Sequence, residues 1–132
     1  MHCKIRPAEF ITAFLFGFFL YSGFEIALRD RTHWTMGLLG GAAFTLLYSM
    51  AQTLSDPLPV KALLGAVFIT AAEYTAGVFD NLIMGWQVWD YSGLAWNLQG
   101  QICLLFSCIW FLLCFPALLI CGAIFRQYHK ST

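Results

Sequence analysis

Long apolar stretches separated by short polar breaks make up most of the chain. Four of these stretches reach about 20 residues, the length at which a helix crosses the hydrocarbon core of a bilayer. The pattern predicts transmembrane helices at about residues 8–28, 34–53, 60–80 and 101–125. We therefore predict an all-α integral membrane protein, with residues 1–132 forming a single membrane domain.

The breaks between these segments carry the residues expected of turns. Residues 29–33 are a charged run, and residues 55–59 contain an aspartate and two prolines. The third break, about residues 81–100, is long for so small a protein and is rich in tryptophan. It is interpreted as a surface loop, an interfacial helix or a re-entrant segment between the third and fourth helices.

Composition supports the membrane class, because 60% of the residues are hydrophobic and only 11% are charged. The formal net charge is zero, so no nucleic-acid partner is predicted. The basic residues are unevenly divided between the two sides of a four-helix topology. One side has Lys4, Arg6, Lys61, Arg126 and Lys130, and the other has Arg29 and Arg31. The positive-inside rule then predicts cytoplasmic termini.

In this topology the polar residues gather toward the outer side. Glu73 lies about 10 Å below the predicted outer surface, where an ionised carboxylate costs about 2.5 to 3.5 kcal/mol. It should therefore face the interior of the bundle or a wet cavity, or be protonated. Glu25, Asp80 and Asp90 belong to the same outer layer. The inner halves of the helices are expected to carry little polarity beyond Tyr48, Ser49, Gln52 and Thr53.

Simpler roles remain open for each of the outer carboxylates. Glu25 can pair with Arg29 one turn later. Glu73 can accept a hydrogen bond from a tyrosine, tryptophan or amide neighbour, and Asp90 can build an Asx turn with the residues that follow it. Two interpretations also remain for the outer tryptophans, which can form an interfacial belt or line a pocket for a cation or flat solute. These are Trp34, Trp86, Trp89 and Trp96.

The cysteines do not predict a metal or redox centre. Cysteines at positions 103, 108, 114 and 121 are spread along one helix and cannot form disulfides within it. The three histidines are far apart in the topology, so no cofactor is predicted. Gly37, Gly40 and Gly41 form a small-residue surface that suits close helix packing, either inside the chain or in a homo-oligomer.

Several motifs together resemble a known family. They are Glu73-Tyr74-Thr75-Ala76-Gly77, Trp89-Asp90-Tyr91-Ser92, and the segment 97–104 followed by Trp110. The chain resembles the family described as "Putative ABC-transporter type IV", also called CmpB-like, which includes the vertebrate transmembrane protein 229 group. Relatives often have an arginine after the glycine where this chain has Gln101. The resemblance implies a transporter in a bacterial plasma membrane, and an ABC role requires a separate ATPase partner because this sequence has no P-loop.

The leading hypothesis is a small permease-like transporter with an outward-facing acidic, aromatic-lined site for a proton, a cation or a cationic small solute. Membrane lipid surrounds it, and a homo-oligomer is possible. Two alternatives are an accessory subunit of a larger membrane complex and an enzyme acting on a lipid, with the enzyme less favoured. The candidate ligand-binding residues are Glu25, Glu73, Tyr74, Trp89, Asp90, Tyr91, Asn97 and Gln101.

Overall fold

Four long helices make up most of the computed structural model, which describes residues 5–29 and 33–130. Each is long and apolar enough to cross a membrane, so the predicted all-α membrane fold is confirmed. The helices are α1 (Pro7–Arg29), α2 (Trp34–Thr53), α3 (Leu58–Gly77) and α4 (Leu104–Tyr128).

The third and fourth helices differ from the prediction at the ends that flank the long connection. Helix α3 continues through a π-helix, η1 (Val78–Ile83), beyond the predicted end at residue 80. Helix α4 begins only at Leu104 because the residues before it are extended. They form strand β2 (Ile102–Cys103), which pairs antiparallel with β1 (Asn97–Leu98). All of residues 84–103 are described and none is helical, so this segment is a loop with a short hairpin.

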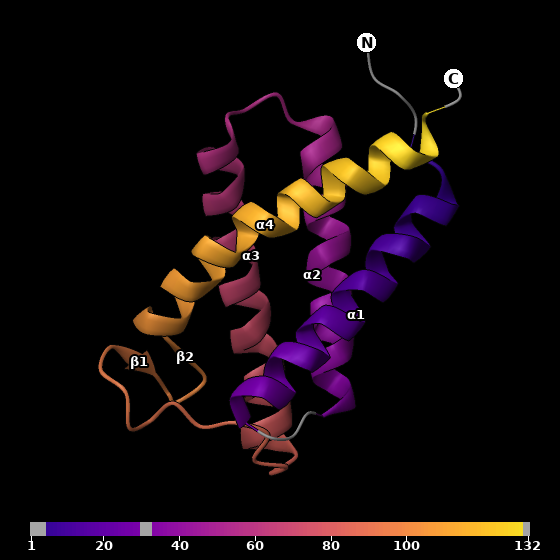
Figure 1. Cartoon of the computed structure of the whole chain (residues 1–132). Coiled ribbons are helices and arrows are strands. Elements are labelled where there is room, and N and C mark those ends of the chain that lie inside the picture. Colours follow the sequence, from indigo (N-terminus) through magenta and orange to yellow (C-terminus); the bar gives the residue numbers. More distant parts are fainter. Residues whose placement is uncertain (1–4, 30–32, 131–132) are drawn as a thin grey trace.

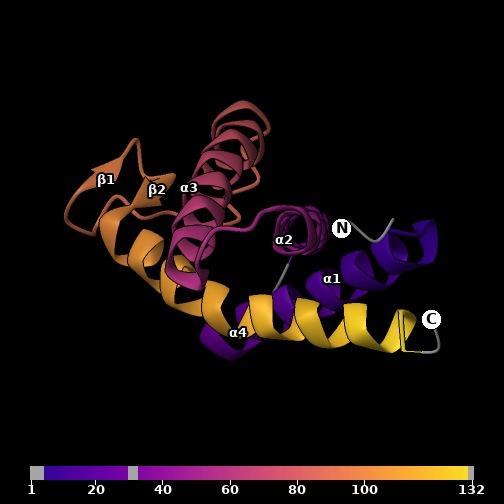
Figure 2. The same cartoon turned by 90° about the horizontal axis from the view of Figure 1, so that it is seen from above.

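Helix α2 contacts the other three long helices (Figure 1). Seen from above, α2 is viewed nearly along its axis, with α1 and α4 passing on one side of it (Figure 2). We call the end with both termini and the α2–α3 turn the terminal end. The opposite end, with the 84–103 loop, is the loop end.

Glycines let α1 and α2 pack closely inside the molecule. A Cβ atom on Gly40 would lie 2.7 Å from the carbonyl oxygen of Gly17 and would also meet the side chain of Tyr21. A Cβ atom on Gly41 would lie 2.7 Å from the ring of Phe14. The small-residue surface of α2 therefore serves helix packing within the chain.

The core is built mainly where α2, α3 and α4 meet. Leu47 of α2, Ala66 of α3 and Leu118 of α4 are among its buried members. Two cysteines, Cys114 and Cys121, are buried there as free thiols and pack as small apolar groups.

Candidate functional site

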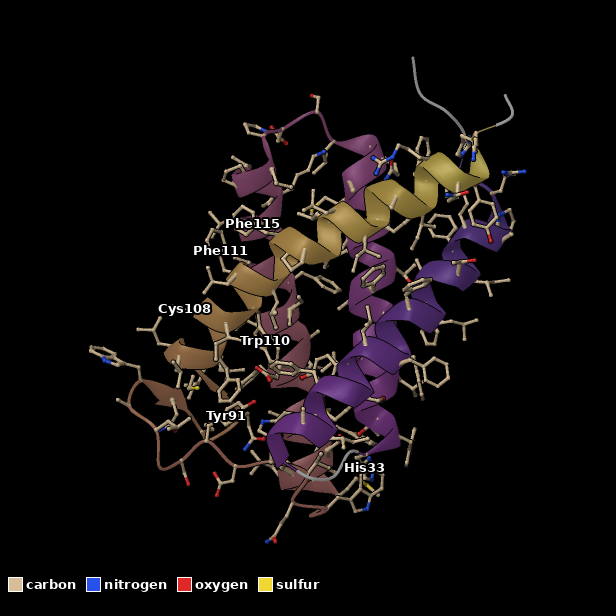
Figure 3. All side chains as sticks on the ribbon, in the orientation of Figure 1. His33, Tyr91, Cys108, Trp110, Phe111 and Phe115 are labelled. Atoms are coloured by element: carbon tan, nitrogen blue, oxygen red, sulfur yellow. The ribbon has the colours of Figure 1, made fainter. Side chains whose placement is uncertain are left out.

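The carboxylate of Glu73 is buried near the loop end of α3, with 1% of the residue exposed. The hydroxyl of Tyr91 donates a hydrogen bond to Oε2 at 3.0 Å, and the indole N–H of Trp110 donates to Oε1 at 3.2 Å. A buried carboxylate needs such donors because it has lost its hydration. Glu73, Tyr91 and Trp110 are called the Glu73 cluster. Figure 3 shows Tyr91 and Trp110 near the start of α4.

Aromatic rings from α1 and α4 surround these two donors. Phe106 stacks on Tyr91 with ring centres 4.7 Å apart and planes at 10°. Tyr21 and Phe24 of α1 contact Trp110, with ring centres 5.6 and 5.8 Å away. These contacts fix the orientation of the Tyr91 hydroxyl and the Trp110 N–H toward the carboxylate.

A polar network holds the 84–103 loop against the end of α3. The side-chain amide of Asn81 donates to Oε1 of Gln101 at 2.8 Å, and the indole of Trp89 donates to the backbone carbonyl of Gln101 at 2.9 Å. Asn81 also accepts a hydrogen bond from the backbone N–H of Val88 at 2.6 Å. A Cβ atom on Gly77 would lie 2.6 Å from Gln101 Oε1 and 2.9 Å from the ring of Trp89, so glycine permits this close approach. These hydrogen bonds hold the 84–103 loop in the position where Tyr91 contacts Glu73.

Three other candidate residues hold the loop itself. Asp90 is exposed, and its carboxylate accepts the backbone N–H of Ser92 at 2.8 Å, the geometry of an Asx turn. The backbone N–H and side chain of Ser92 lower the pKa of Asp90. The Tyr74 hydroxyl donates to Gln99 at 2.7 Å, and Asn97 accepts the backbone N–H of residue 100 at 3.0 Å.

The two remaining carboxylates of the outer layer are also buried. Glu25 is 4% exposed and lies one helical turn beyond Tyr21, on the same side of α1. Its predicted partner Arg29 has a side chain outside the described residues. Asp80 accepts a hydrogen bond from the Thr35 hydroxyl at 2.6 Å and so ties η1 to the start of α2.

The tryptophans of the loop end divide into two groups. Trp34, Trp86 and Trp96 are exposed, as an interfacial belt requires. Trp89 is buried inside the loop network. A further tryptophan, Trp110 of α4, belongs to the Glu73 cluster and also lines the cavity described next.

An apolar cavity of about 270 Å³ lies between α1, α2 and α4. Tyr21, Phe24 and Trp110 line it toward the loop end, and Leu47 and Ile120 line it toward the terminal end. The indole of Trp110 thus has one side on the cavity and its N–H on the buried carboxylate. This arrangement places a carboxyl group behind an aromatic wall.

The chain matches the family model described as "Putative ABC-transporter type IV" over residues 9–132. The protein belongs to this family. Family membership and the four apolar helices together identify an integral membrane protein. Comparisons with curated proteins and with solved structures gave no significant match.

The family match also includes another buried carboxylate, Glu9, at the terminal end of α1. It accepts hydrogen bonds from the Tyr48 hydroxyl and from the backbone N–H of Arg6, the latter at 2.7 Å. Nε2 of His129 lies 3.1 Å from each carboxylate oxygen. The prediction that this end carries little polarity was therefore wrong. The available signal was an acidic residue in the first turn of an apolar helix, but its partner is 120 residues away.

Proposed function

We propose that this family member is the membrane-spanning component of a transporter whose solute is a small cation with an apolar body. The observation that supports this most directly is the cavity wall formed by Trp110, whose indole N–H is bonded to Glu73. The family's transporter description fits the same function.

The positive charge of the solute follows from the chemistry of the cavity's loop end. The faces of Tyr21, Phe24 and Trp110 carry the negative part of the aromatic quadrupole and attract cations by about 0.5 to 2 kcal/mol each. Glu73 adds a carboxylate behind the Trp110 ring, in a region of low dielectric constant where charges interact strongly. A cation in the cavity would offset the cost of burying that carboxylate.

The apolar body of the solute follows from the rest of the lining. Leucines, isoleucines, phenylalanine and small residues form the remaining walls between α1, α2 and α4. A hydrated metal ion would have to shed water there without gaining oxygen ligands, which hard cations require. Among the predicted solutes, an organic cation therefore fits this cavity better than a metal ion.

The orientation in the membrane follows from the basic residues. Five of the seven lie at the terminal end of the topology or in its flanking segments, so we place this end in the cytoplasm of a bacterial cell and the loop end outside. Transport driven by ATP would need a separate ATPase subunit, because this sequence has no P-loop.

The experiment compares two ligands of nearly the same shape on the purified protein in detergent. Benzyltrimethylammonium is a cation with an apolar ring, and neopentylbenzene replaces its nitrogen by carbon. A ligand present at a hundred times its dissociation constant stabilises the native state by about 2.7 kcal/mol. We expect the cation to raise the unfolding temperature more than the neutral compound does.

Glu73→Gln is expected to remove the advantage of the cation while leaving the weak effect of the neutral compound. Asp56→Asn is the matched control, because it removes a carboxylate from an exposed position in the α2–α3 turn. Equal stabilisation by the two compounds in the wild-type protein, or an unchanged preference in Glu73→Gln, would refute a cation site at this cavity.

A further inference from the structure

Three side chains join three helices at the terminal end, far from the Glu73 cluster. Glu9 of α1 is fully buried, accepts a hydrogen bond from the hydroxyl of Tyr48 on α2, and lies 3.1 Å from the imidazole of His129 at the end of α4. The His129 side chain is 14% exposed, so water can reach it from the terminal end. Glu9, Tyr48 and His129 are called the Glu9 cluster.

Of the two basic side chains beside Glu9, Arg6 is always charged, so His129 is the one whose protonation can change the charge of the cluster. The backbone N–H of Arg6 donates to the carboxylate, and the Arg6 guanidinium lies 3.8 Å from it as a permanent positive charge. Arg6 and an ionised Glu9 balance each other, so a proton on His129 adds one positive charge to the cluster. Tyr48 from α2 and Tyr128 from α4 are the neighbouring titratable groups, and Tyr128 bonds Thr12 of α1 at 2.6 Å.

The Glu9 cluster lies on the terminal side of the same cavity. Glu9 precedes the first lining residue of α1, Gly17, by eight positions, or about 12 Å of helix. An apolar plug fills the space between the cavity and the cluster. Its buried residues are Ala13, Cys121 and Ile124.

We propose that the Glu9 cluster is a proton-binding site whose occupancy holds α1 and α4 together below the plug. The bound proton sits on Nε2 of His129, between the two oxygens of Glu9, as a charge-assisted hydrogen bond. When the proton leaves for water at the terminal end, that bond weakens and the two helix ends separate more readily. A role in transport for this separation of α1 and α4 rests on the proposed function. The separation itself is proposed independently of it.

Cys121 of the plug reports the opening, because it is fully buried in the closed arrangement. In a variant that keeps Cys121 and has serine at the other four cysteine positions, we measure the rate of labelling by N-ethylmaleimide in detergent. At pH 6, adding His129→Gln should accelerate labelling about tenfold, equivalent to about 1.4 kcal/mol. By pH 9 the two proteins should label at similar rates, because the bound proton should then have left the Glu9 cluster for water.

Two further variants test the assignment. Glu9→Gln should likewise label faster than the parent at pH 6 and at a similar rate by pH 9, and it provides the test if His129→Gln fails to fold. His33→Gln changes a histidine at the loop end and should keep the pH response. A variant that keeps only the exposed Cys108 gives the pH dependence of the reaction between N-ethylmaleimide and an exposed thiol.

Equal labelling of the parent and both Glu9-cluster variants at pH 6 would overturn the proposal. So would a rate difference that stays the same from pH 6 to pH 9. Neither result depends on the solute, because the labelling is measured without it. Failure of benzyltrimethylammonium to bind would refute the proposed function and leave the labelling result standing.

Discussion

The hydrogen bond from Tyr91 to Glu73 provides a test of how the loop stabilises the buried carboxylate. Tyr91→Phe removes only the hydroxyl and preserves the ring that stacks on Phe106. Tyr91 is 4% exposed and does not line the apolar cavity. The substitution therefore acts on the carboxylate and leaves the cavity wall unchanged.

The expected loss follows from what the hydroxyl does in the folded protein. It donates at 3.0 Å to the carboxylate of a residue that is 1% exposed, so the acceptor cannot turn to water instead. Hydrogen bonds to charged groups contribute about 1.5 to 3 kcal/mol. We expect Tyr91→Phe to lower the free energy of unfolding by an amount in this range, measured by SDS titration in mixed micelles.

Tyr74→Phe is the matched control because it removes a hydroxyl that donates to the neutral amide of Gln99 at 2.7 Å, in an exposed setting. Such a bond competes with water, so its loss should cost about 0.5 kcal/mol. Equal losses for the two substitutions would show that the Glu73 carboxylate does not depend on the Tyr91 donor, and the account of the Glu73 cluster would fail.

Two further predictions concern helix packing and the loop. Gly40→Ala should destabilise the protein by about 1 to 3 kcal/mol, because the new Cβ would meet the Gly17 carbonyl at 2.7 Å; Gly23→Ala, with nothing within 4 Å, should not. The lowered pKa of Asp90 means that its contribution to stability is present above the usual pKa of about 3.9 and is lost as the pH falls through the lowered value. The difference in unfolding free energy between wild type and Asp90→Asn should therefore shrink between pH 6 and pH 3.

The helices could be predicted from the sequence because length and apolarity alone determine whether a segment crosses a bilayer. The predicted second helix, 34–53, agrees with α2 at both ends. Predictions failed at the junctions with the 84–103 loop, where tertiary contacts decide the backbone. Asn81 accepts backbone N–H groups from residues 88 and 89, a contact that no local pattern indicates.

The candidate site, like the fold, could be predicted only in part from the sequence. A lone carboxylate deep in an apolar helix must be paired, and this reasoning identified Glu73 as a buried polar residue. It could not identify which of the many aromatic residues would donate to it. Glu9 was missed because it lies in the first turn of its helix, where an acidic residue is usual. Its burial arises only when the distant end of α4 covers it.

Two of the buried carboxylates, Glu73 and Glu9, lie toward opposite ends of the bundle and depend on different parts of the chain. Glu73 is held by a loop and by the start of α4, whereas Glu9 is held by Arg6, α2 and the end of α4. Helix α4 is thus anchored to a carboxylate at each end, and the cavity lies alongside its middle. We therefore expect a substitution at either carboxylate to alter the contacts that α4 makes along that cavity. In the proposed transporter, one binding cavity would thus lie alongside a helix whose two ends contact carboxylates with different partners.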